Sequence, residues 1–425
     1  MTAHSWDLPA DERNYLRGLA RRQAEIAALP VMAERRRMWY DLNDAKPGAR
    51  PPVIIETWTF DRDFMPPSVL RCESQTGKTI ERQLLRNIRN HDLVDDDKVI
   101  PDDFSITWFT DINELGVTLQ YERVKDAQGF ETGYHILHPI TDITRDLDLL
   151  KPATASVDRE KTMAWKAFLE DLLGEFLPVR LTSGLYGMSM LTHRVVDLMG
   201  MEAFFMAMYE TPDQVHRLMA YLRDNCLRLM RWAEAEGLLC VNNGNQASFG
   251  SSYNFTTRLP APGHDPARVR LADMWGASNS QETVGVAPEM FHEFCFPYYR
   301  DVCAPMGLLY YGCCEATHPY WEDLRRLPHL KKISISRWCD EAFMGEALRG
   351  TELVFSRKPD PNFLSLDEKL NESAWSAHIR QTIEATRGVF VEFIIRDVYT
   401  VHGNVENARR AVALARAAID RHWRG

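Results

Sequence analysis

A cluster of cysteines late in the chain could form a reactive centre. Cys313, Cys314 and Glu315 are consecutive, and Cys339 follows in the next predicted strand–helix unit. Two thiolates and one nitrogen or oxygen ligand make the kind of zinc site that leaves a coordination position open for catalysis. The expected zinc ligands are Cys313, Cys314, Glu315, Cys339 and His318, with Glu282 and Asp397 as further candidates. Because there is no Cys-x-x-Cys pair, buried structural thiols, a redox pair and a nucleophilic cysteine stay open as alternatives.

The elements around this cluster predict an α/β protein. From Pro51 onward, short apolar runs alternate with amphipathic helical stretches, which favours βαβ units and a parallel sheet. Eight predicted strands suit a (β/α)8 TIM-type barrel over residues 51–425. The predicted strands are Val53–Glu56, Ser105–Phe109, Val179–Ser183, Leu238–Asn242, Leu308–Tyr311, Lys332–Ser336, Leu353–Ser356 and Val389–Ile395.

Two segments lie outside this alternation. Residues 1–50 form a predicted N-terminal helical arm, which could pack on the barrel or on the partner subunit of a homodimer. Residues 246–266 are rich in Gly, Ser, Asn and Pro, so we expect a long loop over the mouth of the barrel.

Polar and aromatic residues gather where the predicted strands end. In a parallel barrel the active site lies at the carboxyl ends of the strands. We expect catalytic roles for Asp111, Glu282 and Asp397, although an acid at a strand end often only caps the next helix. The expected substrate-binding residues are Glu56, Trp58, Asn242, Asn243, Asp273, Trp275, Gln281, Trp338, Lys358 and Arg396. The polar stretch 273–282 is interpreted as a lid or substrate-binding loop, or else as capped turns, and the tryptophans suit a flat or apolar substrate.

Composition narrows the class of protein. The net charge of -10 and the isoelectric point near 5.8 argue against a nucleic-acid partner. No apolar run is long enough for a membrane span, and the polar first ten residues do not resemble a secretion signal. Eight dispersed cysteines suit a reducing cytoplasm. Nucleotide-binding glycine motifs, HExxH and GxSxG are absent from the sequence.

Four short motifs, in order, resemble the uroporphyrinogen decarboxylase superfamily, which includes cobalamin-linked methyltransferases. The resemblance runs from about Pro51 to Arg416. The motifs are Ile106-Thr-Trp-Phe-Thr-Asp111-Ile, Thr211-Pro-Asp-Gln-Val215-His216, Tyr310-Tyr-Gly-Cys313-Cys314 and Phe355-Ser-Arg-Lys-Pro-Asp360-Pro361. The third falls where the methyltransferases carry a zinc-binding His-x-Cys, and the first carries the acid that matches the key carboxylate of the decarboxylases.

Departures from the family motifs favour the methyltransferase branch. The decarboxylases hold porphyrin carboxylates with paired arginines, whereas this chain has Glu56-Thr-Trp58-Thr-Phe-Asp-Arg62 there. Of the methyltransferase zinc ligands, Cys313 is kept, Tyr311 replaces the His, and Asp397 or Arg396 replaces the late Cys. The resemblance therefore implies a zinc site that is lost or rebuilt. It also implies a corrinoid carried by a separate protein, because a cobalamin-binding Asp-x-His-x-x-Gly sequence is absent.

Three functions remain open from the sequence. The leading hypothesis is zinc-assisted transfer of a methyl group between a small substrate, such as a methoxylated aromatic, and the cobalt of a separate corrinoid protein. The second is a metal-independent decarboxylase or lyase for a small carboxylic acid, using Asp111 with Lys358 or Arg396. The third is a non-catalytic barrel that binds a cofactor for a partner.

Overall fold

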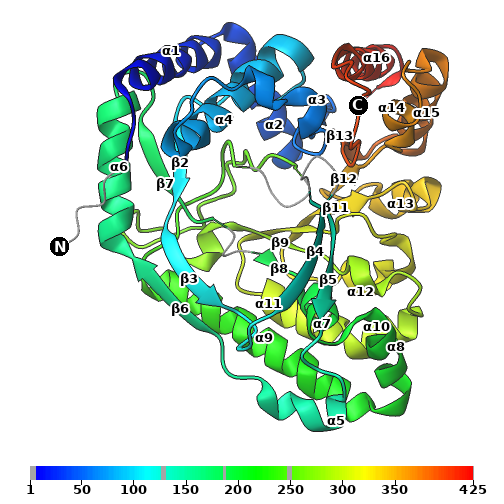
Figure 1. Ribbon diagram of the computed structural model, residues 1–425. Helices are drawn as coiled ribbons and strands as arrows, with labels where there is room; N and C mark the ends of the chain where they lie inside the picture. Colours follow the sequence, from blue (N-terminus) through cyan, green and yellow to red (C-terminus); the bar gives the residue numbers. More distant parts are fainter. Residues whose placement is uncertain (1–5, 126–130, 185–187, 247–250, 425) are drawn as a thin grey trace.

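The computed structural model describes residues 6–125, 131–184, 188–246 and 251–424, and these form an α/β fold. Strands lie in the middle with helices around them (Figure 1). Seven parallel strands pair in the order β1-β13-β12-β11-β10-β9-β8, and β2 pairs in parallel with β7. The parallel strands are β1 Val53–Ile55, β2 Phe104–Thr107, β7 Val179–Thr182, β8 Met188–Ser189, β9 Trp275–Ser278, β10 Leu308–Tyr311, β11 Leu330–Ile335, β12 Val354–Arg357 and β13 Phe390–Ile395.

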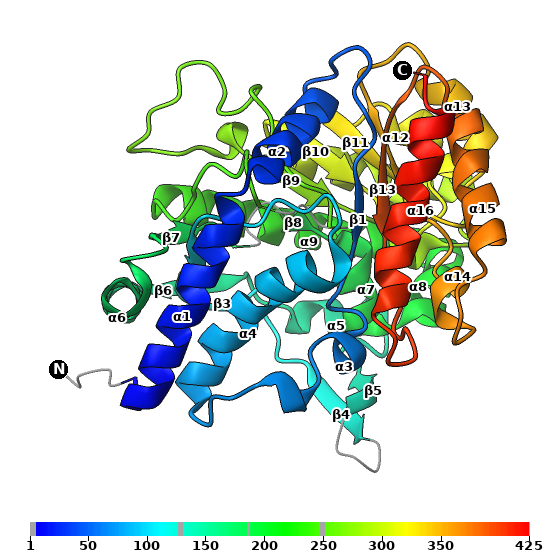
Figure 2. The same cartoon turned by 90° about the horizontal axis from the view of Figure 1, so that it is seen from above.

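Two antiparallel ribbons are added to these strands. β3 (Phe109–Asn113) pairs with β6 (Thr154–Asp158), and β4 (Gln120–Lys125) pairs with β5 (Glu131–Leu137). The β4–β5 ribbon projects from the body of the molecule (Figure 2), and every residue of β4 is exposed.

Helices cover the outside of the sheet. The first eight are α1 Ala10–Ala27, α2 Pro30–Asn43, α3 Asp61–Phe64, α4 Gln75–Arg89, α5 Ile143–Asp146, α6 Arg159–Leu173, α7 Leu191–Met199 and α8 Met201–Glu210. The others are α9 Pro212–Ala235, α10 Pro288–Phe294, α11 Phe296–Cys303, α12 Trp321–Leu324, α13 Glu341–Leu348, α14 Asn362–Ser365, α15 Glu372–Ala385 and α16 Glu406–His422. Side-chain caps at Ser74, Asp340 and Asn371 fix the starts of α4, α13 and α15.

The alternating direction of side chains along the strands separates two apolar clusters. Val391, Phe393 and Ile395 of β13 belong to the large core that includes residues of α15 and α16. Ile394 belongs to a smaller cluster with Trp39 of α2. Because successive side chains of a strand point to opposite faces, these clusters mark the outer and inner faces of the sheet.

The predicted strand at Leu238–Asn242 is wrong. The segment lies between β7 and β9, but it is held there by hydrogen bonds from side chains and not by the backbone hydrogen bonds of a strand. Ser183 Oγ donates to the carbonyl of Cys240 at 2.9 Å, and Asn242 Oδ1 accepts from the Trp275 amide at 2.8 Å. The neighbouring strand β9 was missed, so the lid or loop interpretation of residues 273–282 is also wrong for the strand part.

The arrangement is of TIM type, but its ladder is not continuous in the described part of the chain. Between β1 and β2, carboxylates take the place of a neighbouring strand. The amide of Ile55 donates to Asp96 Oδ2 at 2.9 Å, and that of Val53 donates to Asp97 Oδ2 at 2.7 Å. These side-chain bonds satisfy the edge of β1 where a ladder would otherwise be needed.

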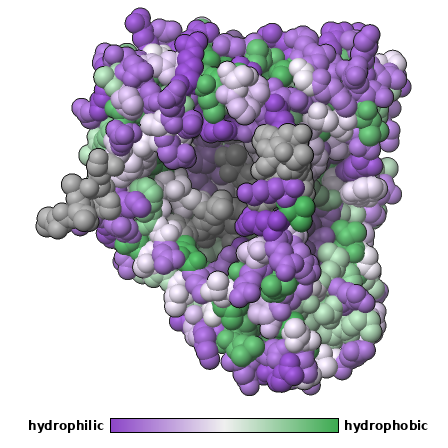
Figure 3. All heavy atoms as spheres, viewed as in Figure 1, coloured by the Kyte–Doolittle hydropathy of each residue, from purple (hydrophilic) through white to green (hydrophobic). Residues whose placement is uncertain are grey.

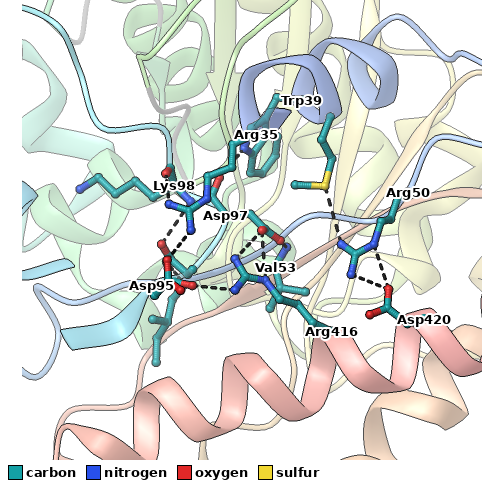
Figure 4. A network of polar contacts seen from close by, with 12 residues as sticks. Arg35, Trp39, Arg50, Val53, Asp95, Asp97, Lys98, Arg416 and Asp420 are labelled. Carbon is teal, nitrogen blue, oxygen red and sulfur yellow. Dashed lines mark hydrogen bonds and ion pairs between the residues drawn. The ribbon is translucent and has the colours of Figure 1, made fainter. Parts of the chain in front are cut away.

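The N-terminal helices pack on the rest of this chain, which is one of the two arrangements left open by the sequence. Trp39 Nε1 donates to the carbonyl of Asp97 at 2.9 Å, and Arg35 pairs with Asp95 at 2.5 Å. Arg416 of α16 pairs with Asp97 at 2.5 Å, so one acid ties both ends of the chain to β1 (Figure 4).

The segment predicted to cover the mouth lies elsewhere over part of its length. Residues 251–266 contain no helix, as expected, but Ser252 is fully buried. Lys332 Nζ donates to Ser252 Oγ at 2.5 Å and to the carbonyl of Tyr253 at 3.1 Å. This part of the loop therefore fills the inner face of the sheet. None of the described helices is both long and apolar enough to cross a membrane.

Candidate functional site

The thiol pair Cys313–Cys314 follows the carboxyl end of β10. Gly312 turns the chain there with φ +97°, and a Cβ on it would meet Ser334 Cβ at 2.9 Å, so only glycine suits the position. The two sulfur atoms lie 3.4 Å apart, and Cys314 Sγ also lies 3.3 Å from Asp397 Oδ2, so the one thiol proton of Cys314 is within hydrogen-bond distance of both acceptors. The turn thus joins the thiols to the end of β13.

Two buried cations accompany the thiols. Arg396, at the end of β13, has its Nε 3.4 Å from Asp397 Oδ2 and 3.5 Å from Glu56 Oε2. Lys358, at the end of β12, donates to Tyr310 Oη at 2.6 Å and to Ser356 Oγ at 2.7 Å. Both cations are more than nine-tenths buried. The ends of β1, β10, β12 and β13 therefore build one polar site.

The surroundings give the two thiols different acidities. The hydrogen bond from Cys314, helped by the charges of Arg396 and Lys358, lowers the pKa of Cys313 against the opposing effect of burial. The same hydrogen bond, with burial, raises the pKa of Cys314. Burial lowers the pKa of Lys358 to about 7. Cys313 is thus the more acidic thiol of the pair, and the pKa of Lys358 lies near neutral pH.

Several buried polar atoms near the strand ends are without a hydrogen-bond partner in the described residues. They include Nη1 of Arg396 and both amide atoms of Asn279. Asn279 is fully buried and directly follows β9. A buried polar group left unpaired costs about 1–3 kcal/mol, so these atoms are suited to pairing with a bound molecule. Asn279 lies in the stretch 273–282 predicted as a lid or substrate-binding loop, but the sequence does not single it out, because β9 is not recognisable as a strand.

The five predicted zinc ligands do not converge. Glu315 accepts the amides of Ser280 and Cys313 at 3.0 and 2.8 Å and so braces the turn. Cys339 Sγ accepts the amide of Thr317 at 3.2 Å.

His318 Nδ1 accepts the amide of Asp340 at 3.3 Å, a further structural contact. Across the described ranges, no three or more His, Cys, Asp or Glu side chains are arranged to hold a metal ion. The five predicted ligands therefore do not form a single cluster in the described residues, and zinc stays an expectation.

The three predicted catalytic acids lie in different places. Asp397 contacts the thiol pair. Glu282 accepts from Thr192 Oγ1 at 2.8 Å and lies 3.0 Å from His193 Nδ1, which joins it to α7. Asp111 is exposed on β3, outside the polar site. Of the three, only Asp397 contacts the cysteines.

Four predicted substrate-binding residues make structural contacts. Asn242 Nδ2 donates to the carbonyl of Trp275 at 3.0 Å, and Asn243 Nδ2 donates to that of Leu259 at 2.7 Å. Asp273 is paired with Arg270. Trp275 is buried on the inner face, with its ring centre 5.7 Å from Lys332 Nζ.

The other predicted binding residues lie beyond strand ends. Trp58 and Trp338 are 57% and 64% exposed, after β1 and β11. The Arg337 guanidinium lies 4.4 Å from the Trp338 ring. Gln281 is half-buried after β9. The face seen in Figure 3 is hollowed near its middle, with mainly hydrophilic residues around the hollow.

Comparison with solved structures gives a guide to the fold. No protein-family model matches the chain, and no curated protein matches it in sequence. A methyltransferase from Methanosarcina mazei is similar in structure, with a TM-score of 0.50 and 11% sequence identity. The similarity covers 90% of this chain and 98% of the methyltransferase. At this identity the likeness concerns the fold alone, so the fold is coarsely that of the methyltransferase.

Proposed function

We propose that this protein is a methyltransferase in which the Cys313 thiolate takes the methyl group of a small substrate. The observation that carries the proposal is the thiol pair at the carboxyl end of β10, with 3.4 Å between its sulfur atoms, in one polar site with the buried cations Arg396 and Lys358. The lowered pKa of Cys313 supports it. The fold shared with a methyltransferase supports it. A thiolate at a strand end of a TIM-type fold lies where such folds place their catalytic groups.

The proposed step needs only groups of this chain and the substrate. The thiolate of Cys313 attacks the methyl carbon, an S–CH₃ bond forms, and the bond from carbon to the substrate oxygen breaks. Lys358, whose pKa is about 7, donates a proton to the leaving oxygen. Arg396 stabilises the negative charge that develops there. Transfer of the methyl group to an acceptor then restores the thiolate.

The acceptor we propose is the corrinoid of a separate protein, as the family resemblance implies. The substrate we propose is a methoxylated aromatic, because the exposed indoles of Trp58 and Trp338 can stack on a flat ring. Zinc remains an expectation from the resemblance, and no step here uses it because the predicted ligands do not converge.

Isotope transfer tests this function. The chain is incubated with methoxylated aromatics labelled with ¹³C in the methyl group, and free cob(I)alamin serves as the acceptor. We expect labelled methylcobalamin from the wild type and from Cys72→Ala, which removes a buried thiol whose raised pKa of about 12 makes it unreactive. Absence of label transfer across the panel would contradict methyl transfer.

A decarboxylase or lyase is the second candidate, favoured by the buried cations. Arg396 Nη1 has no hydrogen-bond partner in the described residues, and Lys358 is buried nearby in the same polar site, so together they could bind a carboxylate. Asp111, the acid expected to act with them, is exposed on β3. Release of CO₂ from a small carboxylic acid after exhaustive chelation, without methyl transfer, would favour this function.

A further inference from the structure

A mostly apolar cavity of about 560 Å³ lies apart from the thiol pair. Its walls come from the carboxyl ends of β2 and β7, from ribbon strand β3, and from helices α7 and α9. The apolar lining includes Trp108, Ile112, Leu191, Leu222 and Met230. Cavities of roughly 300–1,000 Å³ with such walls are typical of small-molecule sites.

Charge is balanced within the cavity. Its charged lining residues are Glu114 and Arg194, which form an ion pair with each other. Arg194 also pairs with Asp197 at 2.9 Å. Burial raises the pKa of the Cys226 thiol to about 12, so this wall residue stays neutral. A charged ligand would lose its hydration here without finding a free counter-charge.

The direction of side chains on β3 explains the apolar wall. Thr110 and Ile112 line the cavity, whereas Asp111 between them does not. Alternation along the strand therefore turns the acid away from the cavity. Trp108 Nε1 donates to the carbonyl of Leu238 at 3.1 Å, so the indole is held in place and its polar atom is already paired.

From these contacts we infer that the cavity is a binding site for an uncharged, largely apolar small molecule, such as a neutral aromatic. Hydroxyl groups of Thr107 and Thr110 in the lining can pair with one polar atom of the ligand. Since β2 and β7 run parallel, the cavity lies where their carboxyl ends meet. The inference does not depend on methyl transfer, because it concerns binding alone.

Fluorescence titration of the full chain with prodan, a neutral naphthalene dye, tests the site. Leu229→Trp and Ile112→Trp fill the cavity from opposite walls, α9 and β3. Met163→Trp adds an indole to an exposed position on α6, outside the lining, and serves as the matched control. We expect saturable binding to the wild type and control, and a Kd at least about tenfold weaker in both filled variants. Anisole should displace the dye, and the 4-methoxybenzoate anion should not.

Three results would overturn the inference. They are the absence of saturable dye binding to the wild type, unchanged affinity in the filled variants, and equal competition by the anion and by anisole. If thermal melting shows that Leu229→Trp does not fold, Ile112→Trp decides, because Ile112 is 37% exposed and tolerates a larger side chain. Dye binding can succeed or fail whether or not ¹³C is transferred, so the two proposals are tested separately.

Discussion

The ion pair between Lys332 and Glu392 lies on the inner face of the sheet, cut off from water. Both side chains are fully buried, and Lys332 Nζ lies 2.9 Å from Glu392 Oε2. Glu392 Oε1 has no hydrogen-bond partner in the described residues, so its carboxylate depends on Lys332 and on Ser252, which donates at 2.9 Å. Lys332→Met would therefore leave a poorly compensated carboxylate inside the protein.

The magnitude follows from this burial. Removing one partner of a buried ion pair costs about 3–5 kcal/mol, whereas replacing both partners by apolar residues is often neutral or stabilising. A domain is stable by about 5–15 kcal/mol, so Lys332→Met should remove a large part of the free energy of unfolding. We expect the double variant Lys332→Met/Glu392→Met to be more stable than Lys332→Met alone.

Urea unfolding followed by circular dichroism measures these differences. The exposed pair Arg410–Glu372, with both side chains 49% exposed, is the control, and Arg410→Met should cost no more than about 1 kcal/mol. Either of two results would contradict this account of the buried ion pair. Lys332→Met would unfold at the same urea concentration as the wild type, or the double variant would be less stable than Lys332→Met.

Three further predictions concern acidity. Burial lowers the pKa of Lys358 to about 7, so the unfolded chain binds this proton more tightly than the folded chain does. The free energy of unfolding of the wild type, relative to that of Lys358→Met, should therefore rise as the pH goes from about 7 to about 10. A difference between the two that stays constant over this range would contradict the lowered pKa. The hydrogen bond that His193 Nδ1 donates to the Glu282 carboxylate raises the pKa of His193, so Glu282→Gln should lower that pKa in an NMR titration, and an unshifted titration would show that the contact is not made. Cys314→Ala should raise the pKa of Cys313 and slow its conversion to the methyl disulfide by methyl methanethiosulfonate at about pH 7.5, and an unchanged rate would exclude the hydrogen bond as the cause.

Most of the parallel strands could be predicted because their apolar runs are bounded by helical stretches. β9 could not, because its sequence Trp-Gly-Ala-Ser contains small residues. The helix side of the strand requires them: a Cβ on Gly276 would meet Met306 Cγ at 2.4 Å. Because close packing requires small residues in β9, its sequence has no run of large apolar residues, which is the pattern that predicts a buried strand.

Strand-end positions predicted part of the site. Glu56, Lys358 and Arg396 gather with the thiols because each follows or ends a parallel strand. Cys339 was expected there too, but its sulfur contacts the Thr317 amide. The direction of a side chain beyond the last strand residue depends on the turn that follows, which spacing alone does not determine.

The proposed methyl relay through Cys313 is tested most directly by mass spectrometry of the peptide that contains it. The chain is incubated with a ¹³C-methyl donor in the absence of acceptor. We predict that Cys313 gains one labelled methyl group, that the label leaves when cob(I)alamin is added, and that Cys72 stays unmodified. Transfer of the label to cob(I)alamin by Cys313→Ala at the wild-type rate would contradict the relay.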